Sequence, residues 1–94
     1  MIIRYLGSVQ ATTGERELHW DKPAVTLRDL LRSLALHYGP RFKYWILDRG
    51  NVPDQHIIVH INGRDSRYLN GANTCLGPND VITMASTIRL RPIL

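Results

Sequence analysis

Two histidines in one apolar segment are the residues of this sequence that most resemble metal ligands. His56 and His60 lie in the run QHIIVHI at 55–61, and their even spacing places both imidazoles on one face of a strand. Along an extended strand they are too far apart for one metal ion to reach both easily, and no cysteine or acid in this run completes a ligand set. We therefore expect no metal site and no cofactor.

A second group of polar residues follows this segment. Arg64-Asp65 and Arg67-Tyr68 come directly after an Asn-Gly pair, where we expect them to fix a hairpin and to form a surface ion pair of small energetic value. The chain shows no combination of nucleophile, base and oxyanion donors, and its single cysteine, Cys75, has no adjacent histidine or acid. We expect a protein that is not an enzyme, with Cys75 as a half-buried filler.

The segment STIRLRPIL at 86–94 could act on another molecule, and two interpretations of it stay open. In the first, Ile88 and Leu90 extend the last strand and the two arginines face solvent. In the second, the segment docks as an extended peptide along a sheet edge or groove of a partner, with its last two residues as anchors. The second interpretation assigns protein-binding roles to Arg89, Leu90, Arg91, Ile93 and Leu94.

Bulk composition restricts the class of protein. Ninety-four residues, 44% of them hydrophobic and 21% charged, are typical of one folded domain. No apolar run approaches the roughly 20 residues of a membrane span, no signal-peptide pattern is present, and there is one cysteine, so we expect a cytoplasmic protein without membrane association. The net charge of +4 comes from scattered basic residues, so we do not expect a nucleic-acid partner.

The elements that must position these residues begin with two strands. IIRYL at 2–6 is β-branched and aromatic, and ERELHW at 15–20 alternates in character, which together predict a hairpin. The polar residues 8–14 between them are expected to form its mobile tip.

In the next segment the spacing of the apolar residues becomes that of a helix. Thr26 is expected to begin the helix in a variant of the capping box, and Gly39-Pro40 should end it. Its apolar face is formed by Leu27, Leu30, Leu31, Leu34 and Tyr38. Arg28 and Arg32 fall on the opposite face, where we expect them to be solvated.

The second half of the chain predicts further strands. The expected elements are a short helical turn at 41–48, turns at 48–54, and strands at 55–61, 65–68 and 81–87. Asn62-Gly63 indicates a hairpin, because both central positions of that turn favour positive φ.

Four short motifs surround this hairpin and the last strand. They are Asn62-Gly63-Arg64-Asp65, Arg67-Tyr68-Leu69, the stretch 71–76, and Asn79-Asp80. Over about residues 26–88 the sequence resembles the MoaD/ThiS family, the sulfur carriers of molybdopterin and thiamin biosynthesis, and it resembles the molybdopterin-synthase small subunit more than the thiamin branch. The resemblance implies an α+β fold, the ubiquitin-like β-grasp, with a mixed sheet of four to five strands around one main helix. Residues 1–94 would form a single domain with 88–94 as its tail.

The resemblance also implies a mechanism. Members of this family act through two terminal glycines, whose carboxylate an E1-like adenylating enzyme activates with ATP before sulfur is transferred to it. In this sequence Leu90-Arg91 or Pro92-Ile93 occupies the place of the glycines, depending on the register, and no Gly-Gly pair occurs. Because Pro92 fixes φ and Ile93 is branched at Cβ, this segment is stiffer and wider than a channel built for glycine accepts.

The outer face of the predicted sheet is a further candidate surface. If alternate residues face the core, the outward set is Ile58, Val81, Thr83 and Ala85, flanked by His56 and His60. An exposed apolar patch often marks a partner surface, but the same residues also satisfy the preferences of a strand, and both interpretations stay open.

We therefore expect a ubiquitin-fold protein that is not activated and that serves as a protein-interaction subunit related to molybdopterin or sulfur-carrier systems. The alternative is an active sulfur carrier or protein modifier, activated at its C-terminal carboxylate, that of Leu94, by an E1-like adenylating enzyme. The expected partner is a protein, such as an E1-like adenylating enzyme or a molybdenum or tungsten cofactor protein.

Overall fold

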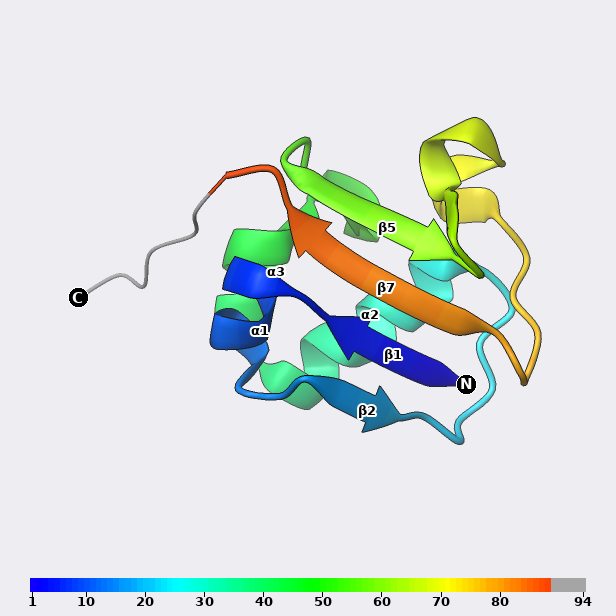
Figure 1. The fold of residues 1–94 in the computed structure, drawn as a ribbon, viewed down its shortest axis with the longest axis horizontal. Helices are drawn as coiled ribbons and strands as arrows, with labels where there is room; N and C mark the ends of the chain where they lie inside the picture. The colour runs from blue at the N-terminus through cyan, green and yellow to red at the C-terminus, as the bar shows by residue number, and fades with distance from the viewer. Residues whose placement is uncertain (89–94) are drawn as a thin grey trace.

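A five-stranded sheet with the main helix behind it forms the centre of the computed structural model, which describes residues 1–88 (Figure 1). The strands are β1 (Ile2–Tyr5), β2 (Glu17–His19), β5 (Ile57–Ile61), β6 (Arg64–Asp65) and β7 (Val81–Ser86). Their order is β2-β1-β7-β5-β6, with β1 and β7 parallel and the other neighbours antiparallel. The first and last strands are therefore adjacent, as in the predicted β-grasp.

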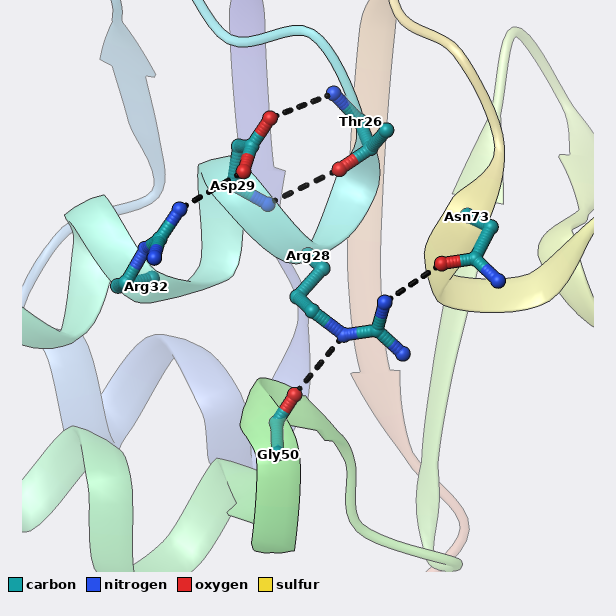
Figure 2. A network of polar contacts seen from close by, with 6 residues as sticks. All are labelled: Thr26, Arg28, Asp29, Arg32, Gly50 and Asn73. Carbon is teal, nitrogen blue, oxygen red and sulfur yellow. Dashed lines mark hydrogen bonds and ion pairs between the residues drawn. The ribbon is translucent and has the colours of Figure 1, made fainter.

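The main helix, α2 (Leu27–Tyr38), packs on the inner face of this sheet. Its predicted capping box is present: the Asp29 amide donates to Thr26 Oγ1 at 3.3 Å, and the Thr26 amide donates to Asp29 Oδ2 at 3.2 Å (Figure 2). The fully buried residues that join helix and sheet include Ile3, Leu27, Leu30, Leu31, Leu34, Val59, Ile82 and Met84. The predicted register of the helix and the inward set of the sheet are thus confirmed.

The segment between β1 and β2 is not the mobile tip predicted for residues 8–14. It forms α1 (Gly7–Thr13), which ends at Gly14 in the left-handed conformation, φ 76°. Val9 is fully buried, and the Tyr38 hydroxyl donates to the Glu15 carboxylate at 2.5 Å, which ties the end of this segment to α2. The prediction was wrong because tertiary contacts stabilise a helix that the polar composition does not signal. The predicted antiparallel pairing of β1 with β2 is present.

The helix after α2 agrees with the predicted short helical turn. It is α3 (Pro40–Ile46), and Gly39 between the two helices has φ 88°, a conformation that favours glycine. The expected turn region then contains a small ladder of β3 (Leu47–Asp48) and β4 (Val52–Pro53) around the 3-10 turn η1 (Arg49–Asn51).

The strand predicted at 65–68 is shorter and differently placed. β6 ends at Asp65, and the 3-10 turn η2 (Ser66–Tyr68) follows, since the Asp65 carboxylate accepts the Arg67 amide at 2.9 Å and so reverses the chain. A further 3-10 turn, η3 (Gly71–Asn73), precedes the last loop. Asn62 and Gly63 both have positive φ, 52° and 82°, as the hairpin prediction requires.

Arg28 lies on the solvent side of α2, as predicted, but its guanidinium also makes hydrogen bonds that the prediction did not include. Its Nε donates to the carbonyl of Gly50 at 3.0 Å, and its Nη1 donates to Asn73 Oδ1 at 2.5 Å (Figure 2). The guanidinium therefore joins α2 to η1 and η3. Arg32, in contrast, is exposed and pairs only with Asp29, at 2.8 Å. Within residues 1–88, no helix combines the length and apolar character needed to cross a bilayer.

Candidate protein-binding surface

The outer face of the sheet is the face that Figure 1 looks onto, with α2 and α3 behind it. Ile58, Val81, Thr83 and Ala85 are half-buried and alternate with buried neighbours, so they share this face as predicted. Ile58 lies opposite Ala85 in the β5–β7 ladder. We call these four residues the sheet surface. The geometry brings them together, and their role in binding remains a prediction.

Two apolar residues that the sequence interpretation did not single out lie on the same face. Ile2 is paired with Val81 across the parallel β1–β7 ladder. Leu6 follows β1, is 52% exposed, and donates its amide to the carbonyl of Met84 at 2.9 Å, which places it beside Ala85. The signal for both was available, because the alternation that buries Ile3 and Tyr5 turns Ile2 and Leu6 outward.

The charged residues at the β2 edge of the sheet surface are paired with one another. Arg4 Nε lies 3.2 Å from Glu17 Oε1, and His19 Nε2 lies 3.1 Å from Glu17 Oε2. These contacts, first that of His19 and then that of Arg4, hold the pKa of Glu17 below its usual value. This edge therefore presents a local network of paired charges.

A second ion pair lies at the opposite edge of the sheet, beside β6. Arg67 Nη2 lies 2.6 Å from Asp65 Oδ2, and the hydrogen bonds from the Arg67 side chain and amide lower the pKa of Asp65 to about 2. His60, opposite Asp65 in the β5–β6 ladder, makes a further, smaller contribution in the same direction. The predicted surface ion pair is thus formed by Asp65 and Arg67.

The remaining candidate ligands stay apart. Among residues 1–88, no group of three His, Cys, Asp or Glu side chains is placed to hold a metal ion. Cys75 is exposed and is not the half-buried filler that was expected. Its neighbour Thr74 takes the buried place instead, because its hydroxyl can donate to the carbonyl of Gly71, at 2.7 Å.

The proposed tail begins where β7 ends. Ser86 is the last strand residue, one before the predicted end, and Ile88 is 48% exposed. The other predicted contact residues of the tail lie outside the described residues: Arg89, Leu90, Arg91, Ile93 and Leu94.

Comparison with protein families and curated proteins gives one match. The model of the ThiS family matches residues 3–84, which begin within β1 and end within β7. A search of curated proteins finds no match.

Solved structures resemble the chain along nearly its whole length. Small archaeal modifier protein 1 from Methanosarcina acetivorans is 26% identical with a TM-score of 0.79, covering 93% of this chain and 91% of that chain. Urm1 from Sulfolobus solfataricus is 25% identical with a TM-score of 0.64, covering 92% and 99%. A chain of the BexX/CysO complex from Amycolatopsis orientalis, at 15% identity and a TM-score of 0.77, covers 93% and 94% and shares the fold.

Proposed function

Because this chain belongs to the ThiS family, we propose that it is a protein-interaction subunit, related to molybdopterin or sulfur-carrier systems, that docks through its sheet surface. The observation that supports the proposal is the row of apolar side chains on the uncovered face of the sheet. Leu6, Ala85 and Ile58 lie side by side there across three strands. A polar row of Arg4, Thr83 and His60 separates this apolar row from the apolar pair Ile2–Val81, and Arg4 is already paired with Glu17, so the face offers two apolar strips to a partner.

The sheet surface alone is too small for a stable complex. Specific interfaces bury about 800 Å² on each partner, more than four half-buried side chains supply. We therefore include Leu6, the exposed Ile88 and the tail residues in the proposed interface. An extended tail would gain affinity from main-chain hydrogen bonds and specificity from alternate side chains, with Ile93 and Leu94 as anchors.

The tail residues also support a role without activation. No glycine occurs in residues 86–94, and both Pro92 and Ile93 make the segment a poor fit to a channel shaped for glycine. The alternative is a working sulfur carrier or protein modifier, activated at Leu94 by an E1-like adenylating enzyme. Family membership and the 26% identity to an archaeal modifier protein favour this second candidate.

The two candidates differ in one chemical product. The protein is incubated with ATP, sulfide and an E1-like adenylating enzyme of the family, and its intact mass is measured, with a Gly-Gly-bearing family member as the positive control. We expect no acyl-adenylate and no gain in mass for this chain. A thiocarboxylate at Leu94 would establish the carrier and refute the interaction-only role.

The contribution of the tail is tested separately. With a purified partner, deletion of 92–94 should weaken binding at least tenfold, about 1.4 kcal/mol, and leave the melting temperature nearly unchanged. An unchanged affinity would remove residues 92–94 from the interface and leave the sheet surface with Leu6 and Ile88.

A further inference from the structure

We propose that a groove between α2 and α3, on the helical side of the molecule, binds an acidic segment of a partner protein that carries an apolar side chain. The groove has a volume of about 640 Å³. It is lined by Arg32, Ala35, Leu36, Gly39, Pro40, Lys43 and Asn51. We call it the α2–α3 groove; its partner and its chemistry differ from those of the sheet surface.

The apolar part of the groove is centred on Leu36. This side chain is 83% exposed, the most exposed leucine of the core-forming helix. At 100° per residue it points about 170° away from the middle of the stripe that the four buried leucines of α2 form, Leu27, Leu30, Leu31 and Leu34. Packing within the domain therefore does not explain it, whereas an apolar side chain seated beside it, against Ala35 and Pro40, would cover it.

The segment that builds the groove is the most basic part of the described chain. Residues 27–51, which form α2, α3, β3 and η1, carry five Arg or Lys and two Asp. Residues 1–26 carry three basic and three acidic residues, and 52–88 carry two basic and three acidic ones. The excess positive charge of the described chain thus comes from the segment that builds the groove, which favours an acidic occupant.

The two cations that line the groove differ in their partners. Arg32 already pairs with Asp29, at 2.8 Å, whereas Lys43 on α3 forms no ion pair within the described part of the chain. Arg41, also on α3, likewise forms none there. A carboxylate placed near Lys43 would therefore gain an attractive contact without displacing one inside the protein.

The walls of the groove are fixed before any partner arrives. Gly39, at φ 88°, turns the chain sharply from α2 into α3, so that Leu36 and Lys43 line one groove from two helices. On the other side, Arg28 holds the carbonyl of Gly50, the neighbour of the lining residue Asn51 (Figure 2). A preformed site loses less conformational entropy on binding.

The test uses a synthetic peptide of alternating leucine and glutamate as the probe. It is titrated into the ¹⁵N-labelled protein, and amide shifts are followed by NMR. We expect the shifts to concentrate at Ala35, Leu36, Gly39, Lys43 and Asn51 and to spare β5 and β7. No shift at the highest soluble peptide concentration, or shifts on the sheet surface, would overturn the proposal, and neither result would alter the activation assay of the proposed function.

Two pairs of variants separate the groove from general effects of charge and hydrophobicity. Lys43→Glu and Arg64→Glu change the net charge equally, but Arg64 lies on β6, away from the groove lining. Lys43→Glu should weaken peptide binding at least tenfold and Arg64→Glu less than twofold. Leu36→Ser should weaken it about fivefold, and Val25→Ser, at another exposed apolar residue, should not. Equal losses within either pair would overturn the proposal.

Two further probes define the chemistry. A peptide with lysine in place of glutamate, and one with serine in place of leucine, should each bind at least tenfold more weakly than the original probe. An oligothymidylate of similar charge should fail to shift the groove residues. If the oligothymidylate binds there as tightly as the peptide, the groove is a general polyanion site and the assignment to an acidic protein segment is wrong.

Discussion

The two faces of this molecule differ in whether their charged side chains are paired within the protein. On the outer face of the sheet, Glu17 and Asp65 at the two edges are each paired with an arginine, and the residues of the sheet surface between them carry no charge. At the α2–α3 groove, Lys43 has no ion-pair partner within residues 1–88 and stands beside an exposed leucine, Leu36. The first face gives a partner little net charge to recognise, whereas the second combines charge with an apolar contact.

This difference follows from the secondary structure on which each face is built. Cross-strand neighbours in a sheet stand directly opposite one another, so charges such as Arg4 and Glu17 find partners within the protein. A short helix such as α3 pairs its charges only three or four positions apart, and it contains no acid. We infer that recognition at the sheet depends mainly on shape and apolar area, and recognition at the groove on electrostatic attraction as well.

The largest predicted loss of stability comes from a substitution in the hydrophobic core that both faces share. Leu34→Ala should lower the free energy of unfolding by about 2–5 kcal/mol, because Leu34 is fully buried between α2 and the sheet. The matched change on the same helix, Leu36→Ala, should stay within about 0.5 kcal/mol. Denaturant unfolding measures both, and similar costs would show that the helix register is wrong.

A smaller loss of stability, with local changes on the groove side only, is expected when the Arg28 side chain is removed. Arg28→Ala removes the hydrogen bonds to Gly50 and Asn73, and we expect a loss of about 1 kcal/mol of stability, with amide shift changes in η1 and η3. Arg32→Ala, which removes an exposed ion pair on the same helix, should cost about 0.5 kcal/mol or less. If NMR instead showed changes across β5 and β7, the two faces would be coupled rather than independent.

The smallest effect concerns the edge of the sheet surface and depends on pH. Because Arg67 lowers the pKa of Asp65 to about 2 in the folded protein, the pair contributes stability above the unfolded pKa of 3.8 and loses it as the pH falls through about 2. The melting temperature of wild type should exceed that of Asp65→Asn slightly at neutral pH, and the gap should close in acid. A gap that widens on acidification would contradict this assignment.

Much of the fold could be predicted from the sequence. The leucine spacing, the Thr26 capping box and the Asn62-Gly63 turn are local signals, and the structure confirms each of them. The helix α1 could not be predicted in this way, because Val9 is its single buried residue and its position depends on contacts with elements distant in the sequence.

For the candidate surfaces, too, local patterns were predictable and contacts between distant segments were not. Alternation along each strand placed Ile58 and Val81 on one face correctly. The role of Arg28 was missed because its partners, Gly50 and Asn73, are 22 and 45 positions away and lie in turns whose location only the tertiary structure fixes. The groove was missed for the same reason, since its lining comes from three elements.

Binding of a purified partner to the variant Val81→Asp tests the central claim most directly. A partner captured with the wild-type chain is purified, and its affinity is measured by calorimetry for wild type, for Val81→Asp and for Arg49→Glu as the charge-changing control, since Arg49 is an exposed residue of η1 outside the groove lining. Circular dichroism first establishes that each variant is folded. We expect Val81→Asp to weaken binding at least tenfold, because it buries an unpaired charge in an apolar interface, and Arg49→Glu to change it less than twofold. Full affinity of a folded Val81→Asp protein would contradict the assignment of the sheet surface as the docking site.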